Sequence, residues 1–365
     1  MLKTTDDLRI KNIRPLIPPA VLLEKLPLNQ TSAQLIIQTR EAAANIMTGK
    51  DDRLLVVVGP CSIHDPTAAL EYANHLRAVL KKWPRELCLV MRVYFEKPRT
   101  ILGWKGLIND PHLDGSFAIN QGLNVARRLL LNITQLGVPA GTEFLDTIIP
   151  QFLSDLVVWG AIGARTVESQ IHRELASGLS MPIGFKNGTT GNVQAAIDAV
   201  RAAHHPHHFL GVTKDGIAAI MGTSGNDTCH IILRGSSHGP NYDPESIAEV
   251  IDALKKTTLP ACLMVDCSHG NSAKDYKRQI IVAASLAEQI AAGNHAICGV
   301  MLESHLVAGK QTLENDKPLK YGQSITDACL SWQETVPLLE QLASAVRQRR
   351  KVNKSTKTHE YENKH

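Results

Sequence analysis

The feature that most constrains the fold is an alternation of short apolar runs with longer amphipathic segments, which repeats eight times along the 365 residues. Eight strand–helix units in a chain of this length are what a (β/α)8 barrel requires, and we expect this α/β fold. A doubly wound open sheet would produce the same alternation. The runs with strand composition are residues 54–59, 87–93, 137–142, 157–163, 182–186, 230–234, 261–266 and 296–302.

Helix signals lie between these runs. Asp65 and Asp243 each precede a proline, which combines an N-cap side chain with the residue best suited to the first helical position. Gly137 and Gly293 end long amphipathic segments, and glycine is a common C-terminal stop. These signals support helices between the strands, as the barrel requires.

Two pieces of the chain lie outside the simple repeat. Residues 1–50 precede the first run, and residues 209–226 contain Asp-Gly between two β-rich stretches, which predicts a hairpin inserted before the sixth strand. We therefore expect an N-terminal extension over 1–50, a barrel over 51–346 and a C-terminal tail over 347–365.

The formal charge of +4 belongs to the tail. Residues 347–365 carry seven Lys and Arg against two Glu, so the rest of the chain is close to neutral. We expect this tail to be disordered and solvated. Because a nucleic-acid surface needs clustered positive charge on an ordered face, we expect no nucleic-acid partner. Neither a signal peptide nor an apolar run of about eighteen residues is present, so we expect a cytoplasmic protein without membrane contact.

Cysteine and histidine usage suggests little special chemistry outside the strand ends. The seven cysteines are odd in number and form no local CxxC pair, so we expect all of them to be reduced, with Cys88, Cys229, Cys262 and Cys298 serving in packing. The histidine-rich stretch 204–208 is interpreted as a solvated loop rather than a metal tract.

Catalytic groups of such barrels lie at the C-terminal ends of the strands, and here these positions carry many cations. Six of them would converge on one mouth, and so many buried charges require anionic ligands. Guanidinium groups match both phosphate and carboxylate, so we expect a ligand with both. The six are Arg92, Lys97, Arg99, Arg165, Lys186 and Arg234.

A second group of strand-end residues combines soft and hard metal ligands. Cys61 follows the first run, His269 the seventh and Glu303 the eighth, and Asp327 lies in the loop after the eighth. Barrel closure makes the first, seventh and eighth strands neighbours. A thiolate, an imidazole and two carboxylates suit one divalent ion such as Mn, Fe, Co or Zn.

Longer motifs carry a resemblance to a known family over about residues 7–347. Together they resemble the microbial, amino-acid-regulated type of 3-deoxy-D-arabino-heptulosonate 7-phosphate (DAHP) synthase. The motifs are GPCSIHD at 59–65, MRVYFEKPRT at 91–100, GWKGLINDP at 103–111, AIGART at 161–166, GFKNG at 184–188, HIILRG at 230–235, DCSHGNS at 266–272 and YGQSITDACLSW at 321–332.

The resemblance implies a metal-dependent condensation of phosphoenolpyruvate, erythrose 4-phosphate and water, which gives DAHP and phosphate. It implies that Lys97, Cys61, His269 and Asp327 take part in catalysis, and that Cys61, His269, Glu303 and Asp327 hold the metal. The substrate-binding residues that it implies are Arg92, Lys97, Pro98, Arg99, Thr100, Glu143, Gly163, Ala164, Arg165, Lys186 and Arg234.

The resemblance also implies feedback inhibition by an aromatic amino acid at a site built from the N-terminal extension and the hairpin. Pro150, Ser180 and Gly211 match positions that line it. Because phenylalanine-sensitive relatives usually carry serine where Gly211 stands, we favour tyrosine as the effector. A homodimer or homotetramer is implied as well.

Three other functions remain open from the sequence. A Schiff-base phosphosugar aldolase would use Lys186 or Lys97 as the imine-forming amine. A metabolite sensor could keep the anion pocket without catalysis, although it would have no need of the four metal ligands. Nucleic-acid binding through residues 347–365 is the third alternative.

Overall fold

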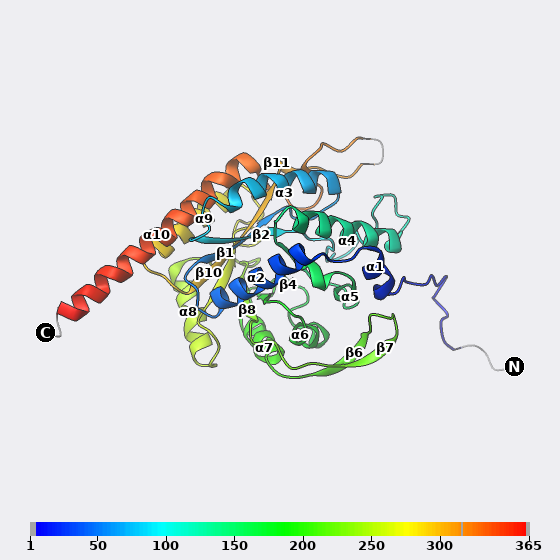
Figure 1. Cartoon of the computed structure of the whole chain (residues 1–365), viewed down its shortest axis with the longest axis horizontal. Coiled ribbons are helices and arrows are strands. Elements are labelled where there is room, and N and C mark those ends of the chain that lie inside the picture. The colour runs from blue at the N-terminus through cyan, green and yellow to red at the C-terminus, as the bar shows by residue number, and fades with distance from the viewer. Residues whose placement is uncertain (1–4, 315–316, 363–365) are drawn as a thin grey trace.

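Eight parallel strands close into a barrel in the computed structural model, which describes residues 5–314 and 317–362, with side chains up to residue 352 (Figure 1). Each strand pairs with the next, and β1 also pairs with β10, so the sheet has no open edge. The predicted barrel is confirmed, and the open-sheet alternative is wrong. The strands are β1 (Leu54–Gly59), β2 (Leu87–Arg92), β3 (Ala140–Glu143), β4 (Trp159–Ile162), β5 (Ile183–Lys186), β8 (His230–Leu233), β9 (Leu263–Asp266) and β10 (Ile297–His305).

Helices surround the barrel and bury the outer faces of its strands (Figure 1). Every residue of the eight strands is buried, which explains why their sequences are continuous apolar runs rather than alternating ones. The helices are α3 (Pro66–Leu80), α4 (Ile119–Gln135), α5 (Pro150–Leu153), α6 (Gln170–Ser177), α7 (Gln194–Ala203), α8 (Pro244–Lys255), α9 (Arg278–Ala291) and α10 (Trp332–Glu362).

The predicted helix caps are present. The Asp65 carboxylate accepts hydrogen bonds from the backbone N–H groups of Thr67 and Ala68, and Asp243 accepts one from Ser246. The cap fixes where each helix begins, and therefore how long the preceding loop can be. The loop before α3 carries Cys61, so the Asp65 cap helps to fix the position of this predicted site residue.

The N-terminal extension packs on the barrel through two helices, α1 (Pro19–Lys25) and α2 (Gln30–Met47). Helix α2 contacts β1, β2 and β10, and Arg40 on it donates hydrogen bonds to the carbonyl oxygens of Ser154 and Val157. Among the described residues, no helix has the length and apolar composition that a membrane crossing needs.

The inserted hairpin is present as predicted, between α7 and β8 (Figure 1). Its strands β6 (His208–Val212) and β7 (Ala218–Gly222) are antiparallel, and Gly216 in the connecting turn has a φ of 79°, which favours glycine. The side chains of Leu210 and Ile220 are 84% and 75% exposed, so the hairpin presents apolar groups to the outside.

The disordered tail expected from residue 347 is wrong for its first residues. Helix α10 continues through this point and extends away from the barrel (Figure 1). Arg349 is only 2% exposed and donates hydrogen bonds to the carbonyl oxygens of Asp52 and Asn294, while Arg350 forms an ion pair with Asp52. Counting charges could not reveal this, because these arginines bind backbone oxygens and an aspartate near the start of the barrel.

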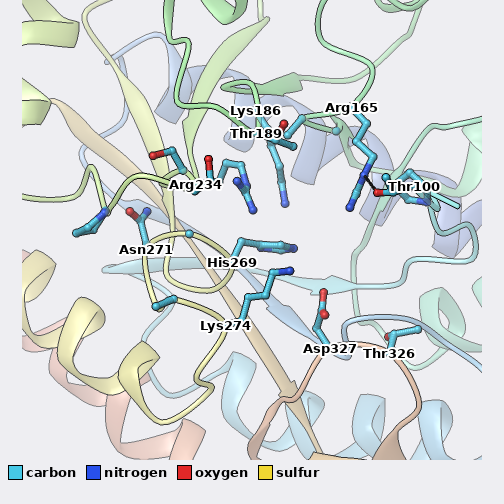
Figure 2. A pocket seen from close by; sticks show the side chains of 18 of the residues that line it. Thr100, Arg165, Lys186, Thr189, Arg234, His269, Asn271, Lys274, Thr326 and Asp327 are labelled. Atoms are coloured by element: carbon cyan, nitrogen blue, oxygen red, sulfur yellow. Dashed lines mark hydrogen bonds between the residues drawn. The ribbon is translucent and has the colours of Figure 1, made fainter. Parts of the chain in front are cut away.

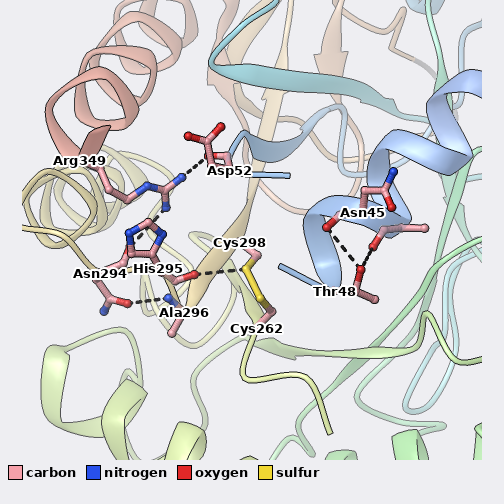
Figure 3. Close-up of a disulfide and its surroundings, with 10 residues drawn as sticks. Asn45, Thr48, Asp52, Cys262, Asn294, His295, Ala296, Cys298 and Arg349 are labelled. Carbon is pink, nitrogen blue, oxygen red and sulfur yellow. Dashed lines mark hydrogen bonds between the residues drawn. A yellow bond between two sulfur atoms is a disulfide. The ribbon is translucent and has the colours of Figure 1, made fainter. Parts of the chain in front are cut away.

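The expectation that all cysteines are reduced is also wrong, because a disulfide joins Cys262 to Cys298 (Figure 3). Cys298 lies in β10 at a shift of register between Ile297 and Gly299, and this irregularity brings it beside Cys262 at the start of β9. Their Cα atoms are 5.6 Å apart although 36 residues separate them in sequence. The other five cysteines are free.

We predict that Cys298→Ser lowers the free energy of unfolding by about 3–4 kcal/mol, because the broken link no longer restricts the unfolded chain. Urea unfolding with and without a thiol reductant measures this. Reductant should destabilise the wild type by a similar amount and leave Cys298→Ser unchanged. Cys88→Ser serves as the control that keeps its sensitivity to reductant. An equal response of both variants would contradict the prediction.

Candidate active site

One cavity of about 1240 Å³ opens at the C-terminal ends of the strands, and its lining gathers side chains from most of them (Figure 2). All eleven predicted substrate-binding residues line it, together with His269 and Asp327. The position follows from the fold: Arg92, Glu143 and Lys186 are the last residues of β2, β3 and β5. Parallel strands bring their ends to one rim, so residues far apart in sequence share one cavity.

Three of the six predicted cations already have side-chain partners within the protein, two of them carboxylates. Arg92 Nη2 lies 2.9 Å from Glu303 Oε1, and Lys186 Nζ lies 2.8 Å from Asp266 Oδ2. Lys97 Nζ lies 3.1 Å from Cys61 Sγ. Burial alone would lower the pKa of Lys97, but the neighbouring Cys61 raises it above its ordinary value. These three cations are therefore held in place within the protein.

The other three cations form no ion pair within the described part of the chain. Arg99 donates to the carbonyl of Trp104, and Arg165 donates to Thr100 Oγ1 at 3.3 Å. Arg234 donates only a long hydrogen bond to the carbonyl of Gly235, and its burial lowers its pKa. Three guanidinium groups without a counter-charge favour anionic ligands with more than one phosphate or carboxylate group.

The predicted metal ligands come together in part. Cys61 Sγ, a Glu303 oxygen and an Asp327 oxygen lie within 4.8 Å of one another. His269 is not a member of that group, but its Nε2 lies 3.7 Å from Glu303 Oε1. Cys61 and Glu303 are completely buried, at the base of the cavity that Asp327 and His269 line. Three predicted ligands thus form a cluster with the fourth beside it.

The chemistry of this cluster fits a divalent transition ion. Burial and the nearby Glu303 raise the pKa of the Cys61 thiol, so an additional positive charge is needed to hold it as a thiolate. Burial would likewise raise the pKa of Asp327, but Lys97 and His269 lower it, so its carboxylate stays ionised. A thiolate with carboxylates and an adjacent imidazole suits Mn, Fe, Co or Zn better than Mg or Ca.

A glycine allows one carboxylate to reach the cavity. A Cβ atom on Gly163 would lie 2.4 Å from Glu143 Oε1, so the Glu143 carboxylate packs directly against the backbone of this glycine. Ala164 and Arg165 follow directly and also line the cavity. The loop after β4 therefore places the Arg165 side chain and the Gly163 backbone at the same wall of the cavity.

Several cavity residues were not predicted from the sequence. Figure 2 shows Lys274 beside His269, directed toward Asp327. It lies eight residues after β9, too far for a search of strand ends, and its φ of 61° is unusual for a lysine. Other unpredicted lining residues include Thr189, Ser236, Ser237, His238, Asn271, Arg278 and Thr326.

The three predicted regulatory residues lie outside this cavity. Pro150 is buried at the start of α5, and Ser180 lines a small separate cavity of about 330 Å³. Gly211 lies in β6 opposite Ala219, where an added Cβ would lie 2.6 Å from Met221 Cγ. A regulatory ligand at these residues would therefore bind away from the active-site mouth.

A closed (β/α)8 barrel with free arginines next to a thiol–carboxylate cluster defines an enzyme that acts on anionic substrates with a divalent metal ion. The model of the DAHP synthetase I family matches residues 30–340, so the chain belongs to that family. The resemblance inferred from the motifs is confirmed.

Known relatives cover almost the whole chain. The Phe-sensitive phospho-2-dehydro-3-deoxyheptonate aldolase of Escherichia coli K12 is 60% identical over 345 residues, 94% of this chain and 98% of the relative. The tyrosine-inhibited enzyme of Schizosaccharomyces pombe is 53% identical over 358 residues, 96% and 95% of the two chains. A solved Francisella tularensis SCHU S4 aldolase of the same name has a TM-score of 0.92 at 56% identity, and the match covers 93% of this chain and 99% of that one.

We predict that the free energy of unfolding of the wild type falls as pH rises, because of Glu96, and that Glu96→Gln abolishes this fall. Glu96 is 3% exposed and accepts hydrogen bonds from the backbone of Leu145 and Asp146, and burial raises its pKa to about 8. The folded protein therefore keeps a proton that the unfolded chain releases above about pH 4.5, so wild-type stability falls between pH 4.5 and 8.

Between pH 4.5 and 8, the free energy of unfolding of the wild type should fall relative to that of Glu96→Gln by about 1 kcal/mol per pH unit. Unfolding free energies at pH 5, 6.5 and 8 measure it. Parallel curves for the two proteins would contradict the raised pKa.

Proposed function

We propose that this protein is a 3-deoxy-7-phosphoheptulonate synthase, which joins phosphoenolpyruvate to erythrose 4-phosphate with the uptake of water and the release of phosphate. This is the first step of the shikimate pathway. The observation that carries the proposal is the single cavity in which three unpaired arginines face a cluster of Cys61, Glu303 and Asp327. The family and the names of the relatives support the same reaction.

The cationic lining suits the charges of the two substrates. Arg165, Lys186 and Arg234 are proposed to bind the phosphate of phosphoenolpyruvate, and Arg92 its carboxylate. Arg99 and Thr100 are proposed to bind the phosphate of the sugar. Arg165 of the first set donates a hydrogen bond to Thr100 of the second at 3.3 Å, so the two substrates would be bound next to each other in one cavity (Figure 2).

In the proposed reaction, carbon 3 of phosphoenolpyruvate attacks the aldehyde carbon of the sugar, water adds at carbon 2, and phosphate leaves from carbon 2. Lys97 is proposed to donate a proton to the aldehyde oxygen as the carbon–carbon bond forms. The arginines stabilise the charge of the phosphates throughout. The divalent ion, which we propose to be Mn, Fe, Co or Zn, supplies Lewis-acid activation at this point. Cys61, His269, Glu303 and Asp327 are the proposed ligands.

A Schiff-base aldolase is disfavoured by the state of its candidate lysines. An imine-forming lysine needs a neutral amine. Lys186 instead forms a buried ion pair with Asp266, and the pKa of Lys97 is raised. The ion pair of Lys186 and the raised pKa of Lys97 therefore suit anion binding or proton donation rather than imine formation.

We predict that the purified protein consumes phosphoenolpyruvate only when erythrose 4-phosphate and a divalent ion are both present. Cys61→Ala should lower kcat at least 100-fold because it removes a ligand, whereas Cys88→Ala should stay close to wild type. Borohydride with substrate should trap no adduct. Full activity in chelator, or a trapped adduct, would overturn the proposal in favour of the aldolase.

We further propose feedback inhibition by an aromatic amino acid, with tyrosine favoured, at a site that includes Pro150, Ser180 and Gly211. The relatives include enzymes named Phe-sensitive, tyrosine-inhibited and Trp-sensitive, so the effector varies within the family. Gly211 has no side chain, and the Met221 side chain packs against it: a Cβ there would lie 2.6 Å from Met221 Cγ.

We predict that Gly211→Ser weakens inhibition by tyrosine at least tenfold and leaves kcat without inhibitor unchanged. The added hydroxymethyl group would start 2.6 Å from Met221 Cγ and would displace that side chain within the proposed site. Inhibition curves with tyrosine, phenylalanine and tryptophan measure the effect, with Ala218→Ser on the same hairpin as the control. Stronger inhibition of the wild type by phenylalanine than by tyrosine would contradict the assignment.

We also propose a cytoplasmic homodimer or homotetramer. Apolar side chains that the single chain leaves exposed support an assembly. Leu8 and Ile13 in the N-terminal extension are 73% and 79% exposed, and Leu210 and Ile220 in the hairpin are similarly uncovered. A second copy would bury such groups.

A further inference from the structure

Asp266 lies where the anion-binding part of the cavity meets the proposed metal ligands. It is the last residue of β9 and is completely buried. Its Oδ2 lies 2.8 Å from Lys186 Nζ and also 2.8 Å from His269 Nδ1, while its Oδ1 accepts a hydrogen bond from the backbone N–H of Ser268. One carboxylate oxygen therefore faces both the lysine and the histidine.

The two neighbours do not share this oxygen equally. Lys186 donates a hydrogen bond to Asp266 Oδ2. His269 Nδ1 is at the same distance, yet it has no aligned hydrogen-bond partner in the described part of the chain. A buried ring nitrogen in this condition is uncommon in a folded protein. Two donors thus approach one acceptor oxygen, and only Lys186 is aligned with it.

The opposite side of the His269 ring faces the cluster. Its Nε2 lies 3.7 Å from Glu303 Oε1, whereas Nδ1 faces Asp266. A histidine that donates its Nδ1–H to a carboxylate has a fixed tautomer and a fixed ring orientation. The availability of Asp266 Oδ2 therefore decides how good a ligand His269 is.

We propose that Asp266 is a positioning residue that couples anion binding at Lys186 to cation binding at His269. This inference rests on the proposed function. When the phosphate of phosphoenolpyruvate binds the Lys186 ammonium, the lysine releases Asp266 Oδ2, which then accepts the Nδ1–H of His269. Conversely, a cation at Nε2 strengthens the Nδ1–H donor, draws Asp266 toward His269 and frees Lys186 for phosphate.

The coupling has to be reciprocal. If phosphoenolpyruvate raises the affinity for a divalent ion by some factor, the ion raises the affinity for phosphoenolpyruvate by the same factor. We expect a factor of about five or more, at the lower end of measured couplings between sites. Both affinities can be measured by calorimetry on metal-stripped protein, with Mn²⁺ as the probe and without turnover, because the sugar is left out.

The first variant removes the charge of the shared acceptor. Asp266→Asn should weaken Mn²⁺ binding about 10–100-fold, as removal of such outer partners does at other metal sites. It should also reduce the coupling factor to about one. Asp243→Asn is the matched control: it makes the same change at the cap of α8, where asparagine is an equally good cap, and it should keep the wild-type coupling.

The second variant leaves Asp266 unchanged and removes the lysine that is hydrogen-bonded to it. Lys186→Met should raise the affinity for Mn²⁺ in the absence of phosphoenolpyruvate, because Asp266 Oδ2 is then free for His269. Arg234→Met is the control for general charge repulsion. It also removes a cation from this cavity, but Arg234 forms no ion pair with Asp266. We expect the gain from Lys186→Met to exceed that from Arg234→Met at least threefold.

The outcomes separate the inference from the proposed function. Wild-type protein that binds Mn²⁺ and phosphoenolpyruvate independently would overturn the coupling alone. Equal gains from Lys186→Met and Arg234→Met would overturn it too, even if Asp266→Asn failed to fold. A wild type that does not bind phosphoenolpyruvate would overturn the proposed function and the coupling together.

Discussion

The pairing of β1 with β10 is the interaction on which the active site depends. In its register Gly59 lies opposite Glu303, so the loop after β1 starts beside the only carboxylate that pairs with Arg92 in the described structure. Cys61 Sγ then lies 3.8 Å from Asp327 Oδ2, although 266 residues separate them in sequence. An open sheet would leave these two strands at opposite edges. The cluster exists because the barrel closes.

A second constraint is the balance of buried charge. A cavity lined by eight lysines and arginines would be costly to fold if all were unpaired. Arg92, Lys97 and Lys186 instead lie against Glu303, Cys61 and Asp266. Glu303 and Cys61 are proposed metal ligands, and Asp266 contacts a third, His269. The remaining arginines are the ones exposed to ligand. Substrate binding and metal binding thus draw on one set of acidic groups, which is why Asp266 can link them.

Much of this architecture could be predicted from the sequence. The apolar runs located the strands to within a few residues, and the strand-end rule placed the cations at one mouth, because both follow from local pattern. Lys274 and Arg278 were missed since they lie well beyond the end of β9, in the loop before α9 and at the first residue of that helix. The link between Cys262 and Cys298 depends on a shift of register, and the burial of Arg349 depends on backbone oxygens of distant loops. Such features follow from tertiary packing and leave no local pattern.

The most direct test of the account is the location of a divalent ion in crystals grown with Mn²⁺ and phosphoenolpyruvate. The account predicts one anomalous scattering peak per chain, in contact with Cys61, Glu303 and Asp327, with His269 turned toward it. A peak elsewhere, or an intact cluster of these residues with no peak at saturating Mn²⁺, would contradict the claim that barrel closure builds a metal-dependent active site.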